Sequence, residues 1–327
     1  MPVIFDFGEW LGDIQVLRLL RSLRCSAVYE AQRGEEKVLL KVAHNDCQDQ
    51  LRLEARTLVE LAQKTQHPML PVLLPAYQQA DTRQRPYGKT MFRGETKYYT
   101  VFQHAEGEFL HDKLLKNPQP WYQHAAWIAI MLSDAIAFMH IQANRLHLTL
   151  NPDAIYVQED KAGVPRPLLL DLGLLSEPNH VDKAWVDRYA VPGYAAPELF
   201  TSEFPVSQSS DVYGLGLLLY QMLAGHPAYE SAQRRDADIR NDVIRTAPPP
   251  LARTDLAKEI HEIVQQAINR TPQYRQQDVR VFAKMLRTKF GEVPAEKKRN
   301  WNRRLITIAA IIGLFTTVWI LLAALIG

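Results

Sequence analysis

Residues 147–157 read HLTLNPDAIYV, and two further stretches follow at short spacing: DLG at 171–173 and VPGYAAPEL at 191–199. The next stretch, SSDVYGLGLLLYQMLAGHPAY at 209–229, is apolar almost all round between Val212 and Leu223. A helix of that composition is typical of the buried centre of a domain. We therefore expect the core of a folded domain here, with the rest of the chain arranged around it.

The part of the chain before residue 105 is rich in short strand-like runs. Their β-rich composition predicts four strands: IQVLRLL at 14–20, AVYEAQ at 27–32, KVLLKVA at 37–43 and, after a turn-rich insert, KYYTVFQ at 97–103. One helix is predicted among them, from Asp49 to Leu61, because its apolar residues recur at helical spacing.

After Gly107 the pattern becomes helical. Ala125, Ile128, Leu132 and Met139 belong to a 3-4 period that predicts one long helix, and a last helical region ends near Phe290. Strands followed by helices predict an α+β fold of two lobes. We expect a small β-rich lobe over residues 1–105 and a larger helical lobe over residues 106–292.

The charge of the chain is concentrated near its end. The net charge is +2, and residues 296–304 hold five basic residues and one acidic residue, a local +4 that leaves −2 for the rest. A body so close to neutral offers no basic face, so we expect no nucleic-acid partner. Two cysteines, Cys25 and Cys47, fit a reducing compartment, and Cys25 is expected to be a plain buried thiol. The first ten residues do not resemble a secretory signal.

Residues 305–326 contain no charged residue. As a helix this segment spans about 33 Å, which is enough to cross a bilayer core of about 30 Å. We therefore expect a transmembrane helix from Leu305 to Ile326. The basic linker over residues 293–304 predicts, by the positive-inside rule, that the preceding domain is cytoplasmic. Only Gly327 follows the span, so we expect a tail-anchored, single-pass protein of the cell membrane.

The predicted span also indicates partners. Ala309, Gly313 and Thr317 form a small-xxx-small ladder that could pair two spans into a homodimer. Basic residues 297–304 could bind anionic lipid, although a topology signal has the same composition. Besides membrane lipid, we expect a protein partner at the membrane.

Taken in order, the motifs resemble those of protein kinases, and of the bacterial Ser/Thr type in particular. VLLKVA at 38–43 resembles the V-A-I-K strand, and Glu54 lies thirteen residues after Lys41 inside the predicted helix. HLTLNPDAIYV stands where H-R-D-L-x-x-x-N belongs, DLG resembles D-F-G, and Ala196-Pro197-Glu198 is the A-P-E signature. The resemblance covers residues 14–290 and implies the two-lobed kinase fold, with Arg275 as the buried ion-pair partner of Glu198.

The same resemblance predicts that catalysis is lost. The Asp that positions the substrate hydroxyl falls on Thr149, and losing a positioned base costs roughly 10²–10⁴ in rate. The Asn that holds a second Mg²⁺ falls on Ala154, and the catalytic-loop lysine falls on Asn151. We expect no functioning catalytic residue and no metal site; Asp171 is the only familiar metal ligand left. His147 is expected to serve packing.

Nucleotide binding is expected to be lost as well. The three glycines of the phosphate-binding loop fall on Arg21, Leu23 and Ser26, whose side chains deny phosphates a close approach to the backbone. Two bulky residues, Leu39 and Tyr156, fall where the resemblance places adenine. No cofactor is expected.

Lys41, Glu54 and Asp171 are therefore open to two interpretations. They are either the remnants of an ATP site or a charge network that holds the lobes together, and the filled pocket favours the network.

The segment from Asp171 to Glu198 also departs from an activation segment that phosphorylation switches. Val191 replaces the usual threonine before P-G-Y, and Leu148 replaces the arginine that would clasp a phosphate. Ser176 is the only Ser or Thr between Leu172 and Ala195. Phosphorylation switching of the usual kind is therefore not expected.

Two functions follow from these patterns. The first is a membrane-anchored pseudokinase, an inactive kinase-like domain that acts as a signalling scaffold or binding module. The alternative is an active or weakly active ATP-dependent Ser/Thr kinase that uses ATP, Mg²⁺ and replacement catalytic residues such as Lys41 and Asp171. The losses at Thr149 and Ala154 favour the first.

Overall fold

The computed structural model describes residues 5–77, 85–178 and 180–296, and it divides the chain into two compact units, residues 1–293 and 294–327. All helices and strands assigned within the described residues belong to the first unit. The predicted span over residues 305–326 and its basic segment from residue 297 lie outside the described residues.

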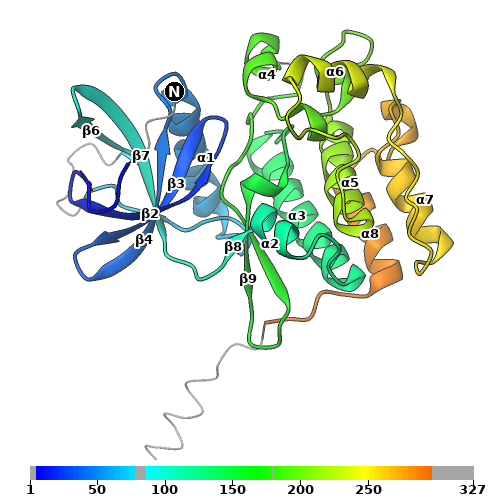
Figure 1. Ribbon diagram of the computed structural model, residues 1–327, viewed down its shortest axis with the longest axis horizontal. Helices are drawn as coiled ribbons and strands as arrows, with labels where there is room; N and C mark the ends of the chain where they lie inside the picture. Colours follow the sequence, from blue (N-terminus) through cyan, green and yellow to red (C-terminus); the bar gives the residue numbers. More distant parts are fainter. Residues whose placement is uncertain (1–4, 78–84, 179, 297–327) are drawn as a thin grey trace, which may run out of the picture. The chain divides into compact units, whose positions relative to one another are not determined.

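A seven-stranded antiparallel sheet and one helix form the smaller lobe (Figure 1). Their bounds are β1 (Trp10–Leu11), β2 (Ile14–Ser22), β3 (Ser26–Arg33), β4 (Glu36–Ala43), α1 (Gln48–Lys64), β5 (Leu73–Leu74), β6 (Gly88–Phe92) and β7 (Glu95–Gln103). The strand order is β1-β2-β3-β4-β7-β5, and β6 also pairs with β7. The four predicted strands are confirmed, and the predicted helix is one residue longer at its start and three at its end.

The turn-rich insert before β7 contains a strand that sequence reasoning missed. β6 pairs with β7 through a two-residue turn, in which Arg93 and Gly94 have φ angles of 50° and 80°. Positive φ at both central positions suits the twist of a hairpin, so this turn fixes the register of β6 against β7. In β6 only Gly88 is buried, so the strand lacks the apolar alternation by which strands are recognised.

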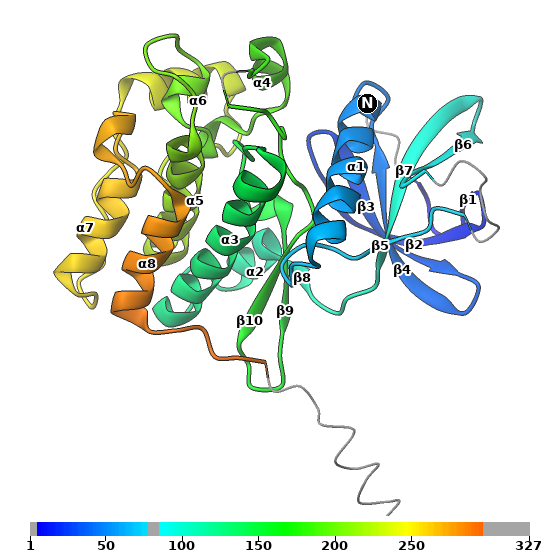
Figure 2. The same ribbon diagram turned by 180° about the vertical axis from the view of Figure 1, so that it is seen from behind.

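The larger lobe is helical, with a three-stranded sheet beside the smaller lobe (Figures 1 and 2). Its bounds are β8 (Glu108–Phe109), α2 (Leu110–Lys116), α3 (Tyr122–Ala143), β9 (Ile155–Glu159), β10 (Pro165–Leu169), α4 (Lys183–Tyr189), α5 (Gln208–Ala224), α6 (Asp236–Arg245), α7 (Lys258–Ala267) and α8 (Val279–Phe290). The expectation of a purely helical pattern after Gly107 was wrong for β8, β9 and β10. These strands have two to five residues each, and β10 carries two prolines, which an edge strand tolerates.

Helix α5 is the buried centre that its sequence predicts. Fourteen of its 17 residues are buried, a capping box of Ser207 and Ser210 begins it, and Gly225 ends it with a φ angle of 84°. Helix α3 packs beside α5 and α8. Within the described residues α3 alone has the length and apolar composition of a membrane span, and 72% of its most apolar window is buried inside the fold. It is therefore a core helix.

The apolar core continues from one lobe into the other. Val28 of β3, Leu39 of β4 and Phe102 of β7 belong to the same buried cluster as Ala154 and Tyr156 of the larger lobe. All five side chains are at most 3% exposed. Residues 104–107 connect the lobes at this level, between β7 and β8.

Candidate functional site

Lys41 and Glu54 are brought together in the buried space between β4 and α1. The Lys41 ammonium donates to both Glu54 carboxylate oxygens, at 2.8 and 2.7 Å, and to the Leu170 carbonyl at 3.0 Å. Asp171 lies next to them, with its Oδ2 atom 3.7 Å from Lys41 Nζ. The three residues named from the sequence therefore form one cluster.

The charge of Lys41 is stabilised by its carboxylate neighbours. Burial alone would lower the pKa of Lys41, but the carboxylates of Asp171 and Glu54 outweigh burial and raise it. An ammonium has three N–H donors, and these three contacts use all of them. A phosphate could gain a hydrogen bond from Lys41 only if one of those contacts broke.

His147 is held as a neutral, buried imidazole beneath Asp171. Its Nε2 atom lies 2.9 Å from the Asp171 backbone carbonyl, which requires an N–H donor, and its Nδ1 atom accepts from the Thr149 amide at 3.4 Å. Burial lowers the pKa of His147, which agrees with one protonated nitrogen. The packing role expected for this residue fits the geometry.

The segment over residues 147–154, which the resemblance identifies as the catalytic loop, is held in place by Asp211 at the start of α5. Its carboxylate accepts hydrogen bonds from the His147 amide at 2.9 Å, the Leu148 amide at 2.6 Å and His140 at 2.7 Å. Burial would raise the pKa of Asp211, but the hydrogen bond and charge of His140 outweigh burial and lower it. These contacts fix the backbone of the loop next to Thr149, the residue at the position where the resemblance expects the catalytic Asp.

The residues that replace the catalytic set make local contacts instead. The Asn151 side chain donates to the Thr149 carbonyl at 2.7 Å and accepts from the Asp153 amide at 2.9 Å, which caps a short 3₁₀ turn over residues 152–154. Ala154 contributes a buried methyl group where a metal ligand would stand. Asp171 Oδ1 accepts from the Gly173 amide at 2.8 Å. No group of three or more His, Cys, Asp or Glu residues able to hold a metal ion occurs within the part of the chain that the structure describes.

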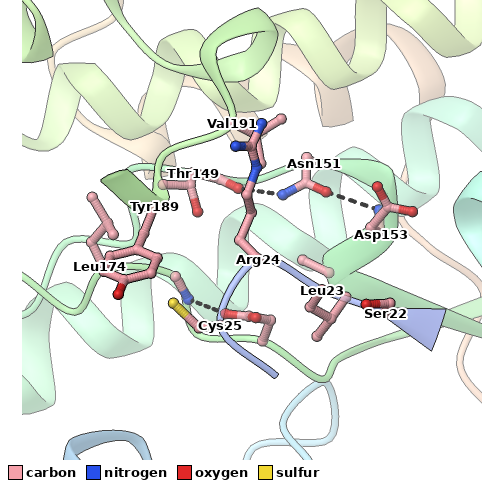
Figure 3. Close-up of a pocket in the computed structure, with 13 residues that line it drawn as sticks. Ser22, Leu23, Arg24, Cys25, Thr149, Asn151, Asp153, Leu174, Tyr189 and Val191 are labelled. Atoms are coloured by element: carbon pink, nitrogen blue, oxygen red, sulfur yellow. Dashed lines mark hydrogen bonds between the residues drawn. The ribbon is translucent and has the colours of Figure 1, made fainter. Parts of the chain in front are cut away.

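A cavity of about 280 Å³ lies between the turn that joins β2 to β3 and the catalytic loop (Figure 3). Thr149, Asp171 and Val191 line it from the larger lobe, and Arg24 and Cys25 line it from the turn. Its volume is just below the range of about 300–1,000 Å³ that is usual for ligand pockets. Cys25 is half-buried there, and a hydrogen bond with Cys47, together with burial, raises its pKa, so it stays a thiol.

The turn over the cavity is tied down by arginine. Arg24 pairs with Asp236 of α6, with one N–O distance of 3.0 Å, and Figure 3 shows its side chain extending toward Val191. Arg21 pairs with Asp112 of α2 and lies 3.4 Å from Asp153. The resemblance places Arg21 at the first glycine of the phosphate-binding loop, and the structure places its side chain between two carboxylates.

Tyr156 is one of the two bulky residues that fall where the resemblance places adenine. The Tyr156 hydroxyl donates to the Gly107 carbonyl at 2.7 Å and lies 3.3 Å from the Ala105 carbonyl, so it reaches the connector between the lobes. Its ring packs edge-on against Phe109, with 5.3 Å between the ring centroids, and Leu39 is fully buried in the same apolar cluster. Sequence reasoning named Tyr156 for its bulk. The two backbone carbonyls that it contacts were not foreseen.

The activation segment contains a helix that was not predicted. Helix α4 carries Tyr189, whose hydroxyl lies 3.3 Å from the Asp46 carbonyl of the smaller lobe, and Arg188, which pairs with the Asp46 carboxylate. Asp182 caps the helix through the amides of Ala184 and Trp185. The capping Asp182 was the one available signal for this helix. Leu148, which stands in place of the phosphate-clasping arginine, is buried with a φ angle of 67°.

The pair expected between Glu198 and Arg275 is present. Two hydrogen bonds of 2.7 and 2.9 Å join them, and both side chains are completely buried. Ser210 donates to Glu198 at 2.7 Å, and Arg275 also donates to backbone carbonyls, so both charges are well compensated.

Comparison with known sequences identifies the family of this chain. The profile of the protein kinase domain family matches residues 24–290. This chain belongs to the protein kinase domain family. Among solved structures, a double mutant of the PknI kinase domain from Mycobacterium tuberculosis aligns with a TM-score of 0.62 at 21% identity, covering 88% of this chain and all of that one. That likeness supports the two-lobed fold.

Curated relatives of this chain include Ser/Thr protein kinases. A probable serine/threonine-protein kinase, zyg-1, from Caenorhabditis briggsae is 26% identical over 263 residues, which are 77% of this chain and 34% of that protein. The human serine/threonine-protein kinase DCLK3 is 26% identical over 46% of this chain and 22% of its own length. The chain thus spans about a fifth to a third of the length of these relatives.

Proposed function

We propose that this protein is a pseudokinase, a kinase-like domain that binds a protein partner at the membrane and neither binds ATP nor transfers phosphate. The observation that carries the proposal is the contact of the Tyr156 hydroxyl with the carbonyls of Gly107 and Ala105. The aromatic side chain joins the cores of the two lobes where a nucleotide base would have to lie. Binding ATP would require this side chain to leave a buried position and lose a hydrogen bond of 2.7 Å.

The residues around the position expected for the ATP phosphates support the same proposal. Kinase catalysis depends on positioning and on charge stabilisation by metal ions and a lysine. Here Thr149 offers no carboxylate, Ala154 offers no metal ligand, and Lys41 has its donors occupied by Glu54 and Leu170. Arg24 and Arg21 are paired with carboxylates of the larger lobe.

One observation favours the alternative of a weakly active kinase. Lys41, Glu54 and Asp171 keep the mutual arrangement that active kinases need, and the cavity of about 280 Å³ adjoins Asp171 and Thr149. A relocated base with one Mg²⁺ ion on Asp171 would be required.

Phosphotransfer from radiolabelled ATP separates the two functions. We expect the wild type to label neither itself nor a generic protein substrate, and the Lys41→Met variant to match it. Labelling by the wild type that Lys41→Met abolishes would show an active kinase. Thr149→Asp alone should not create activity, because Ala154 and the glycine-free turn still limit binding.

We further propose that residues 305–326 anchor the domain to the cell membrane, with the domain on the cytoplasmic side. The support is the uncharged composition of this segment and the basic residues before it. Full-length protein should stay with membranes in high salt and leave them only in detergent, whereas a chain ending at Val293 should be soluble. Release of the full-length protein by salt alone would contradict the anchor.

A further inference from the structure

Two exposed ion pairs join the lobes beside the 280 Å³ cavity. Arg24, on the turn between β2 and β3, pairs with Asp236 of α6, and Arg188 of α4 pairs with Asp46 of the smaller lobe. Arg24 lines the cavity, and so does Tyr189, the neighbour of Arg188. The four charged side chains are between 36% and 59% exposed. Water and salt therefore reach both of these contacts between the lobes.

The turn that carries Arg24 is fixed to the smaller lobe. The Leu23 amide donates to the Ser26 carbonyl at 2.7 Å, and the Leu23 side chain is buried. The His44 amide donates to the Cys25 carbonyl at 2.9 Å, and the His44 ring lies 3.0 Å from the Leu23 carbonyl. A displacement of the smaller lobe would therefore carry Arg24 with it.

The partner of Arg24 is fixed to the larger lobe. Asp236 is the first residue of α6, and this helix buries Ile239 and Val243. Arg240 of the same helix donates to the Asp187 carboxylate of α4 at 2.8 Å. Asp236 therefore stays with the larger lobe, so its pair with Arg24 forms only while the lobes are close together at the cavity.

The pair of Arg24 and Asp236 is well aligned but weak enough to open. Two guanidinium nitrogens donate, one to each oxygen of the carboxylate, and this hydrogen bonding lowers the pKa of Asp236. Exposed ion pairs add little stability, so losing this one should change the ratio of closed to open protein only about twofold to fivefold. The apolar cluster that runs through both lobes would still hold them together.

We infer that the pair of Arg24 and Asp236 is a latch that closes the cavity. While the latch is closed, the Arg24 side chain extends from the turn toward Val191 of the larger lobe (Figure 3). When the latch opens, the turn moves away from the catalytic loop together with the smaller lobe, and a polypeptide gains access to Thr149 and Asp171 on the cavity wall. The latch requires neither the membrane anchor nor the loss of ATP binding, so it goes beyond the proposed function.

Alkylation of Cys25 tests the latch in the full-length protein in nonionic detergent, because this half-buried thiol lines the cavity. The reagent is N-ethylmaleimide, which is uncharged, and mass spectrometry distinguishes its adduct at Cys25 from that at buried Cys47. We expect Asp236→Asn to raise the rate at Cys25 about twofold to fivefold. Salt at about 1 M should raise the wild-type rate more than the variant rate, because the variant has already lost the pair. The matched control is Asp238→Asn, which removes the same charge from the same helix. Its partner Arg235 lies on the same lobe, so the rate should not change.

A distance between the lobes provides a second measurement. Spin labels are attached at Glu35→Cys of the smaller lobe and Glu203→Cys of the larger lobe, both at exposed positions, in a chain that also carries Cys25→Ala and Cys47→Ala. We expect high salt to extend the distribution of label distances toward longer values. Asp236→Asn should show the longer distances at low salt as well.

Three results would overturn the latch. The first is an equal rise in alkylation for Asp236→Asn and Asp238→Asn, which would show that charge on α6 sets the rate. The second is a parallel rise at Cys25 and Cys47, which would show unfolding rather than opening. The third is a set of rates and distances that neither salt nor Asp236→Asn changes. None of these measurements involves ATP or lipid, so failure of the latch would be distinct from failure of the proposed function.

Discussion

The Tyr156 hydroxyl gives the clearest test at the scale of single residues. Tyr156→Leu removes the hydroxyl and most of the ring, so it should cost about 1–3 kcal/mol of unfolding free energy. Combined with Leu39→Ala, it should open a space in which adenosine raises the unfolding temperature. The matched control, Tyr156→Phe, keeps the ring and should cost about 0.5–1.5 kcal/mol without any response to adenosine. An adenosine response in Tyr156→Phe would mean that the ring does not block the base.

The burial of His147 predicts that the stability of the folded protein depends on pH. Burial lowers its pKa, so near pH 6 the unfolded chain takes up a proton that the folded chain refuses. The contribution of the neutral His147 imidazole to the free energy of unfolding is therefore present in full above about pH 6.5. It is lost as the pH falls below that value. Thermal unfolding should show His147→Asn less stable than wild type at about pH 7.5, with a smaller difference at about pH 5.5. His180→Asn, the same substitution at an exposed position, serves as the control variant. A wild-type advantage that grows in acid would contradict the neutral imidazole.

The parts of the site that depend on residue type and on sequence spacing could be predicted from the sequence. Lys41, Glu54 and Asp171 meet because a strand, a helix and a loop of fixed spacing bring them together. Leu39 and Tyr156 were identified by their positions in the resemblance together with their bulk. The pairing of Arg24 with Asp236 could not be predicted, since it joins residues 212 positions apart through two exposed side chains. Pairs of this kind depend on the relative position of the two lobes.

At the scale of elements, the buried pair of Glu198 and Arg275 fixes the segment after the activation region to the turn before α8. Both partners are fully buried, so removing either one leaves an uncompensated charge. Glu198→Gln and Arg275→Met should each cost about 3–5 kcal/mol in urea unfolding. The control is the exposed pair of Arg235 and Asp238 on α6, where Asp238→Asn should leave the midpoint unchanged. Equal effects from both pairs would mean that burial does not set the cost.

Elements with a strong apolar period were predicted, and short or exposed ones were not. Helices α3 and α5 and strands β2, β3, β4 and β7 each bury a face or a whole surface, which leaves a pattern in the sequence. Strands β6, β8 and β10 depend on a turn or on a partner strand for their existence. Helix α4 has seven residues, too few for a period to be recognised.

At the scale of the whole molecule, the proposed anchor predicts the side of the membrane on which the domain lies. A protease added outside intact cells should leave residues 1–293 uncut, and the same protease added to permeabilised cells should cut exposed loops. Cleavage in intact cells would reverse the proposed orientation. A cytoplasmic protein of known topology serves as the control for leakage.

One apolar cluster extends through both lobes. The pseudokinase proposal requires that no nucleotide binds between them. A ligand at a hundredfold excess over its dissociation constant stabilises a protein by about 2.7 kcal/mol, which thermal unfolding detects easily. The deciding measurement is therefore the unfolding temperature of the wild-type protein titrated with ATP to millimolar concentration, alone and with Mg²⁺ or Mn²⁺. We predict no shift in any of the three series. A saturable rise in unfolding temperature would show that Tyr156 yields to adenine and would contradict the pseudokinase proposal.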